Sequence, residues 1–336
     1  MIKKGVFISF FLILGQVLCS QDIHFSQFYS NPIIFNPATS GQLEFDYRAN
    51  VNYKSQWSAI GNAYKTIAFN TDFVPFRKKN NSGFLGTALS VYSDKAGKSK
   101  LGTTLASLSV AYHLKLNDNN FLAAGLQFGY VQKSIDIDGL KWDNQFDGTD
   151  YNSNLPTGEN FYGQRKKYFD FGAGINWGLV ASNKNKLNIG IAITHVGKPN
   201  QSFNSLQSDY LKPNIVFGGD SEIKFENNVT LSPVWNFQFQ GKLFELNSGL
   251  LLKYGLGMDS KYTGINKSSY VTFGCIYRYR DAAIVVLNYD YLGVYSIGFS
   301  YDFNVSRLSY ATNGRGGVEL SLVYKGLYKN KVKIKT

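Results

Sequence analysis

The chain has 336 residues and includes 26 Phe, 23 Tyr and 33 Gly but only 7 Pro. Its mean hydropathy of −0.19 excludes a helical membrane protein, because long apolar helices would raise that average. The formal net charge is +12, yet the basic residues are not interleaved with aromatic ones as in nucleic-acid-binding segments, so nucleic acid is not an expected partner.

Residues 1–20 have the pattern of a secretory signal peptide. Lys3 and Lys4 precede an apolar run from Gly5 to Leu18, and we expect cleavage after Ser20. The run is too short for a membrane anchor, and no later part of the sequence is apolar enough to cross a membrane as a helix. The chain is therefore expected to be exported, and any membrane crossing would have to use strands.

Residues 21–41, which would begin the mature chain, mix aromatic side chains with Asn, Pro and Ser. The aromatic ones are Phe25, Phe28, Tyr29 and Phe35. Such a mixture suits neither a lipid-facing strand nor a free tail. We predict that this segment folds into the periplasmic mouth or the lumen of a barrel, as a plug or rim held by its aromatic residues. A lead-in that caps the first strand is an equally open interpretation.

From residue 42 to residue 325 the sequence alternates between apolar residues and small or polar ones. In residues 295–304, which read YSIGFSYDFN, apolar and aromatic residues occupy every second position. A strand has a period of two, so one face can contact lipid while the other lines a lumen. The strands of a water-soluble β-sandwich alternate as well. The aromatic content and the export signal favour the membrane.

About fourteen such segments follow one another, separated by polar turn clusters. Single-chain bacterial barrels have an even number of strands. We therefore predict an all-β fold, a transmembrane antiparallel β-barrel of about 14 strands in the bacterial outer membrane. The segments are expected to start near Phe45, Tyr64, Phe84, Thr103, Phe121, Tyr168, Leu187, Leu211, Val229, Phe244, Tyr270, Ala282, Val294 and Gly317.

Long polar stretches separate some of these segments, notably residues 136–166, 197–210 and 304–316. In a barrel with both termini in the periplasm, alternating short turns and long loops place the long ones outside the cell. These loops would offer a binding face to a partner protein, because aromatic side chains often anchor interfaces. Packing of the same side chains on the barrel itself is the alternative. The candidate anchors are Tyr151, Phe161, Tyr162, Phe203 and Tyr210.

We expect contacts with lipid or lipopolysaccharide but no cofactor. Asp143, Asp147 and Gly148 resemble the start of a calcium loop, but Asn154 stands where the closing glutamate would be and no helices flank the segment. We therefore interpret the stretch from Asp143 to Asp150 as an ordinary outer loop and not as a calcium site.

We expect no enzymatic activity. His24, His113 and His195 are isolated in the sequence, and no metal-binding or nucleophile motif occurs around them. A hydrolase would need a serine, a histidine and an acid that only folding brings together, and the sequence leaves that alternative open.

The last predicted strand is expected to carry a signal for insertion into the outer membrane. Leu320, Leu322 and Tyr324 alternate along it as lipid-facing residues. Replacing Leu320 and Tyr324 with charged residues should block assembly, since a lipid-facing charge near the midplane costs roughly 2 to 4 kcal/mol. Residues 326–336 form a lysine-rich tail that we interpret as solvated, with anionic lipid, lipopolysaccharide phosphate or an acidic protein as alternative partners.

The sequence after the leader, QDIHFSQFYSNPIIFNPATSG, resembles the opening signature of the PorP/SprF family of type IX secretion system membrane proteins. Similarity continues through YKSQW, SDKAG and YRYRDAAIVVLNYDY and covers essentially all of the mature chain. Thr39 and Ser40 depart from the pattern of many relatives, and the lysine tail is longer. The signature residues are Gln21, Phe25, Ser26, Gln27, Tyr29, Asn31, Pro32, Asn36, Pro37, Gly41, Arg48 and Trp57.

The resemblance implies a non-enzymatic outer-membrane barrel that acts with the type IX translocon. It implies partners in the type IX secretion machinery and a secreted cell-surface protein, such as a gliding adhesin, whose C-terminal domain the barrel helps to export and to hold at the surface. Two other functions suit a barrel of this size. One is a diffusion channel or hydrophobic-solute transporter, and the other is a purely structural anchor.

Overall fold

The computed structural model of the chain describes residues 23–43, 45–58, 61, 63–76, 83–137, 140–158, 163–181, 185–204, 207–225, 227–257, 269–307 and 309–327. The expected leader, Gln21 and the tail from residue 328 onward lie outside the described residues, as do Phe161 and Tyr162. Within the described part of the chain, no helix combines the length and the apolar character needed to cross a membrane.

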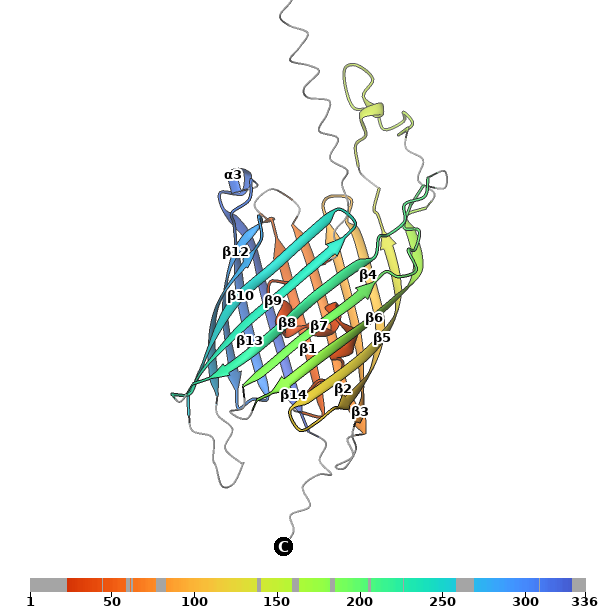
Figure 1. Cartoon of the computed structure of the whole chain (residues 1–336). Helices are drawn as coiled ribbons and strands as arrows, with labels where there is room; N and C mark the ends of the chain where they lie inside the picture. The colour runs from red at the N-terminus through yellow and green to blue at the C-terminus, as the bar shows by residue number, and fades with distance from the viewer. Residues whose placement is uncertain are drawn as a thin grey trace, which may run out of the picture.

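Fourteen strands form a single closed barrel in which each strand is antiparallel to both neighbours (Figure 1). This confirms the predicted fold, and every strand begins within three residues of its predicted start. The strands are β1 (Tyr47–Gln56), β2 (Tyr64–Phe76), β3 (Gly83–Ala96), β4 (Leu101–Lys115), β5 (Asn120–Ser134), β6 (Arg165–Val180), β7 (Lys186–Thr194), β8 (Asn214–Lys224), β9 (Val229–Gln240), β10 (Leu243–Gly255), β11 (Tyr270–Arg278), β12 (Ala282–Tyr291), β13 (Tyr295–Asn304) and β14 (Arg315–Gly326).

The barrel closes where the last strand meets the first. β14 and β1 pair from Tyr47 opposite Gly326 to Gln56 opposite Gly317. All other neighbouring strands are consecutive in the sequence. Closure removes the free strand edges that two packed sheets would retain. The β-sandwich alternative is therefore wrong.

The alternation in the sequence separates an outer face from an inner one. In β13, Tyr295, Ile297 and Phe299 are exposed, whereas the alternating residues Gly298, Ser300 and Asp302 are buried. The same alternation holds in β14, where the predicted insertion residues Leu320, Leu322 and Tyr324 are all exposed on the outer face. A barrel whose exposed face carries aliphatic and aromatic side chains needs an apolar surrounding medium, which the hydrocarbon of a membrane provides.

The two ends of the barrel differ. Residues 135–164, 195–213 and 305–314 connect β5 to β6, β7 to β8 and β13 to β14 at one end, drawn at the top of Figure 1. We call it the loop end, and we call the opposite end, where β1 begins and β14 finishes, the terminal end. One further long connection, residues 256–269, belongs to the terminal end, and most of it falls outside the described residues.

Residues 23–43, which we call the luminal segment, lie inside the barrel (Figure 1, red). The segment forms three short helical turns, η1 (Phe28–Ser30), α2 (Pro32–Phe35) and η2 (Pro37–Thr39). Phe25, Ser26, Gln27 and Ser40 within it are completely buried. The core of this protein is therefore the contact between one short segment and the inner wall of the barrel.

Candidate functional site

The local sequence of the luminal segment explains its compact shape. Pro32 and Pro37 each stand at the start of a helical turn, where a missing N–H costs nothing. The side chain of Asn36 accepts a hydrogen bond from the N–H of Ala38 and caps the second of these turns. Gly41 ends the compact part with a φ of +74°, which a residue with a side chain rarely adopts.

Glycines at inward positions of the strands make room for this segment. A Cβ atom placed on Gly125 of β5 would lie 2.5 Å from the backbone nitrogen of Ala38. One placed on Gly86 of β3 would lie even closer to the carbonyl oxygen of Ser40. The small inward residues therefore do more than line a lumen. They allow the backbone of the luminal segment to touch the backbone of the wall.

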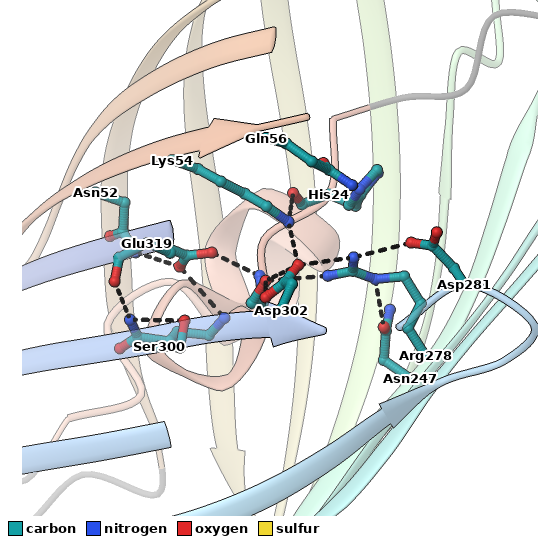
Figure 2. Close-up of polar contacts among 12 residues, drawn as sticks. His24, Asn52, Lys54, Gln56, Asn247, Arg278, Asp281, Ser300, Asp302 and Glu319 are labelled. Carbon is teal, nitrogen blue, oxygen red and sulfur yellow. Dashed lines mark hydrogen bonds and ion pairs between the residues drawn. The ribbon is translucent and has the colours of Figure 1, made fainter. Parts of the chain in front are cut away.

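A buried group of charged residues holds the start of the luminal segment near the loop end (Figure 2). The N–H of Ser26 donates to Glu319 Oε2 at 2.6 Å, and the N–H of Gln27 donates to Glu319 Oε1 at 3.2 Å. The hydroxyl of Ser26 donates to both carboxylate oxygens of Asp302, at 2.6 and 2.8 Å. Glu319 of β14 thus accepts hydrogen bonds from the N–H groups of Ser26 and Gln27, and Asp302 of β13 accepts the hydrogen bond from the Ser26 hydroxyl.

Two cations belong to this group, and both pair with Asp302. Arg278 at the end of β11 donates to Asp302 Oδ2 at 3.1 Å and to the Ser26 hydroxyl oxygen at 3.1 Å. Lys54 Nζ of β1 lies 3.4 Å from Asp302 Oδ2 and donates to the carbonyl oxygen of His24 at 3.2 Å. These wall residues are all buried. Buried charges are stable in a protein interior only when they are paired and hydrogen-bonded, as they are here.

A second contact fixes the middle of the segment. The side-chain oxygen of Asn31 accepts hydrogen bonds from Asn50 at 2.6 Å and from Asn70 at 2.9 Å, while its amide donates to Asn52 at 2.7 Å. All four amides are buried. These three bonds favour one position of the segment on β1 and β2, because a shift of one residue would break all of them.

A third contact lies towards the terminal end. Arg48 of β1 donates two hydrogen bonds to Asp72 of β2, at 2.9 and 3.1 Å, and Asp72 accepts a third from the N–H of Gly41 at 3.1 Å. The ring of His113 contacts the carbonyl oxygen of Ser40 at 2.7 Å. The chain thus runs through the lumen from the loop end, at His24, to the terminal end, where β1 begins.

The opposite side of the lumen is apolar. Phe28 and Phe35 of the luminal segment pack against a cluster of inward residues from β7 to β12, with Ile34 and Tyr29 beside them. The wall residues of this cluster are Ala192, Val216, Val234, Leu251, Ile276, Ala282, Ile284 and Val286. The prediction that aromatic residues hold the segment is therefore incomplete, because charged and amide side chains hold its other side.

A pocket remains beside the segment, towards the loop end of β3 to β9. Ile34 and Phe35 bound it on one side, and the wall contributes Ser90, Gln127 and Asp170 among others. His195 lines it too and makes a 2.8 Å contact with Asp170 Oδ2. The luminal segment thus contacts two sides of the lumen and leaves a pocket beside it, towards the loop end of β3 to β9.

The signature residues come together in this luminal site. Ser26, Gln27, Asn31 and Asn36 bond to the barrel wall, and Arg48 supports the contact at Gly41. Phe25 is buried and Tyr29 accepts a hydrogen bond from Asn288 at 2.8 Å. Trp57 lies apart, at the loop end of β1, where its ring packs on Tyr64.

Sequence reasoning missed the wall charges Lys54, Arg278 and Glu319. A signal was present, since each stands at an inward position of a predicted transmembrane strand, where a charge needs a partner. The apolar half of the wall was missed as well. The continuous run AAIVVL in β12 indicated it, because a strand that is apolar on both faces is covered on both faces.

Three of the residues predicted to bind a partner are among those that the structure describes, in addition to the two that it does not, and they lie in the connections of the loop end. Tyr210 is exposed and Phe203 is half-buried, both between β7 and β8. Tyr151, between β5 and β6, donates a hydrogen bond to Gln145 at 3.2 Å and has Lys141 over its ring. The structure does not bring these three residues into contact with the luminal segment.

The stretch from Asp143 to Asp150 binds its own backbone. Asp147 accepts hydrogen bonds from the N–H groups of Thr149 and Asp150, both at 2.9 Å. These bonds, that of Asp150 foremost, hold the pKa of the Asp147 carboxyl below its usual value. Among the described residues, no three His, Cys, Asp or Glu side chains are arranged to hold a metal ion.

Comparison with known proteins gives a family and a fold. The profile of the family described as type IX secretion system membrane protein PorP/SprF matches residues 17–324. No curated protein matches the sequence. Among solved structures, the TodX deltaS2S3 mutant monoaromatic hydrocarbon channel is 9% identical, with 88% of this chain and 94% of that chain covered and a TM-score of 0.52. The Pseudomonas putida toluene transporter TodX is 10% identical, with 92% and 95% covered and a TM-score of 0.48. At such low identity, the likeness to the first of these structures is a likeness of fold.

Proposed function

Because the chain belongs to the PorP/SprF family of type IX secretion system membrane proteins, we propose that it is a non-enzymatic component of that system which assists export and surface attachment of a partner protein. The closed barrel and the family place it in the bacterial outer membrane. The partner would be a secreted cell-surface protein such as a gliding adhesin, bound through its C-terminal domain.

The observation that carries this proposal is the extent of the family match. Residues 17–324 include the luminal segment and all but the last two residues of the fourteen strands, so the match covers the segment together with the wall that holds it. A lumen occupied by an anchored segment suits a scaffold that receives a partner at its rim. The buried charged residues serve to hold that segment, and a role as an enzyme is not needed to explain them.

In this proposal the loop end faces outward and receives the partner. Its long connections present exposed aromatic side chains, Tyr210 and Phe146 among them, which are the residues that commonly anchor interfaces. The terminal end, where β1 begins, would face the periplasm and the rest of the secretion machinery. The segment between residues 23 and 43 would close the path between the two sides.

Deletion of the gene, followed by quantitative proteomics of the cell surface, tests the proposal. We expect loss of one or a few surface proteins that carry type IX C-terminal domains, and restoration by the native gene. A Tyr151→Ser/Tyr210→Ser variant should insert normally but restore display poorly. As a control, Tyr254→Ser changes an exposed tyrosine on the outer face and should restore display fully. An unchanged surface proteome after deletion would contradict the proposal and leave a structural anchor or a diffusion channel.

A diffusion channel is the second candidate, because the pocket beside the luminal segment opens space within the lumen. The fold is also shared with a protein described as a monoaromatic hydrocarbon channel. Single-channel recording in planar bilayers separates the two functions. A closed scaffold should be silent, and removal of residues 23–41 should produce steady conductance. Large conductance of the native protein would favour the channel.

A further inference from the structure

The charged residues of the fourteen strands are distributed very unevenly between the two faces. Apart from Arg315 at the bulged start of β14, the charged residues at outward positions are Lys65, Lys95, Arg165 and Lys167. All four are exposed and all four are basic. The remaining strand charges, among them every carboxylate, occupy inward positions. We call these four residues the outer basic patch.

The pairing of the strands gathers the patch into one sector. Lys65 of β2 lies directly opposite Lys95 of β3. The row continues across β4 at Gly102 and β5 at Ser134 to Arg165 of β6. Lys167 follows two residues further along β6, on the same face. The three strand spacings between Lys95 and Arg165 amount to about 14 Å.

The patch lies at the edge of the apolar band, on the side of the loop end. In β6 the exposed residues Phe171 and Phe169 are followed, towards the loop end, by Lys167 and then Arg165. In β2 the exposed residues Phe69 and Ile67 are followed by Lys65. Basic side chains therefore begin where the hydrocarbon-facing residues stop, at the depth where lipid head groups start.

Within the part of the chain that the structure describes, no acidic side chain offsets this charge. Among the described residues, none of the four basic side chains takes part in an ion pair. Lys65 and Lys95 occupy opposed positions whose Cβ atoms are typically about 5 Å apart, an arrangement that is destabilising for like charges unless an anion lies between them. The outward neighbours Ser93, Thr104 and Gln132 are neutral hydrogen-bonding groups.

The rest of the outer face shows no such feature. At the loop end of β9, β10, β11 and β13 the outward residues are aromatic, namely Phe239, Phe244, Tyr277 and Phe303. At the terminal end they include Tyr254, Tyr291, Tyr295 and Tyr324. Aromatic residues suit an uncharged membrane interface. The outer basic patch thus differs from the rest of the strands' outer face, where the one other charged residue is Arg315.

We propose that the outer basic patch binds the phosphate groups of a phosphorylated glycolipid in the outer leaflet. Lys65 and Lys95 would share one phosphate, and Arg165 with Lys167 would take a second, with hydroxyl and amide side chains between them as hydrogen-bond donors. A head group of disaccharide size with a phosphate at each end reaches across such a row. The proposal shares the outward orientation of the loop end with the proposed function, but it does not depend on any secretion partner.

The test uses the full-length barrel in nanodiscs of neutral phosphatidylcholine. The probes are a bis-phosphorylated disaccharide lipid of the lipid A type, its dephosphorylated form, phosphatidylglycerol and inorganic phosphate. We expect binding of the phosphorylated glycolipid alone, weakened about 30-fold in Lys65→Gln/Lys95→Gln, since each basic residue near an anionic lipid contributes about a factor of five. Lys242→Gln/Arg307→Gln removes two exposed charges from turns of the same end and should bind as the native protein does.

Several outcomes would overturn the proposal. One is equal binding of the phosphorylated and dephosphorylated glycolipids. Others are equal binding of phosphatidylglycerol, which would indicate a general anionic-lipid surface, and binding of inorganic phosphate alone. Equal losses in the patch variant and the control variant would point to net charge as the cause. Resistance of the folded barrel to SDS at room temperature shows for each variant that assembly is intact, and the single variant Lys95→Gln gives a smaller loss if the double variant does not fold.

Discussion

The two sides of the lumen bind the luminal segment through different kinds of interaction. The wall of β13, β14, β1 and β2 presents Asp302, Glu319, Lys54 and a group of asparagines, each bonded to a particular atom of the luminal segment. The wall from β7 to β12 presents aliphatic side chains that pack on Phe28 and Phe35. Directional bonds on one side fix where the segment lies, whereas apolar packing on the other side stabilises it without specifying its register.

This comparison can be measured with one reporter. The hydroxyl of Ser40 is completely buried and has no hydrogen-bond partner among the described residues, so Ser40→Cys should change little. In a Cys275→Ser background, which removes an exposed thiol, its rate of labelling by a polar maleimide reports how often the luminal segment leaves the wall. Each variant below is compared with that reporter protein.

The largest effect is expected from Asp302→Ala. The change leaves Arg278 and Lys54 buried without their shared carboxylate, and breaking a buried ion pair from one side costs about 3 to 5 kcal/mol. Labelling of the reporter should accelerate by about 100-fold or more. Asp290→Ala is the control, because Asp290 is an inward carboxylate that bonds Ser296 and has no ion pair among the described residues. Similar labelling rates for the two variants would mean that the ion pairs of Asp302 do not hold the luminal segment to its wall.

A smaller effect is expected where backbone meets backbone. Gly125→Ala would place a Cβ atom 2.5 Å from the nitrogen of Ala38, whereas Gly129→Ala on the same strand would meet Asp170 Cβ at an ordinary 3.6 Å. Overpacking of this kind typically costs about 1 to 3 kcal/mol. Labelling should rise roughly tenfold to hundredfold for Gly125→Ala and stay near the reporter rate for Gly129→Ala. If both variants label at the reporter rate, the backbone of the segment does not contact β5 at Gly125.

The apolar wall should respond more weakly to a conservative change. Ile284→Val removes one buried methylene next to the luminal segment, and such changes cost about 0.5 to 1.5 kcal/mol. Labelling should rise between about twofold and tenfold. Val285→Ala, at the adjacent outward position, is the matched control and should not alter the rate. A response of the size expected for Asp302→Ala would mean that packing, and not charge, positions the segment.

The smallest effect is expected at the pocket. Ser90 and Gln127 line it and make no hydrogen bond to the luminal segment. The double change Ser90→Ala/Gln127→Ala should alter the labelling rate by less than about twofold. Faster labelling would show that the pocket side contributes to holding the segment, and the contrast between the two walls would then be less sharp.

The sequence alone determined the barrel, its strand count and the face to which most strand residues belong. It could do so because the period of two is written into adjacent residues, and because closing a single-chain barrel calls for an even number of strands. The signature residues also marked the segment that fills the lumen. Of its aromatic residues, Phe28 and Phe35 pack on the apolar side of the lumen.

Only the tertiary structure decided which inward residues meet. Ser26 and Glu319 lie 293 residues apart in sequence, and Ser26 and Asp302 lie 276 apart. No local pattern encodes such contacts, because they depend on the diameter of the closed barrel and on the stagger of its strands. The division of the lumen into a charged wall and an apolar wall, and the passage of the segment from the loop end to the terminal end, arise from that closure.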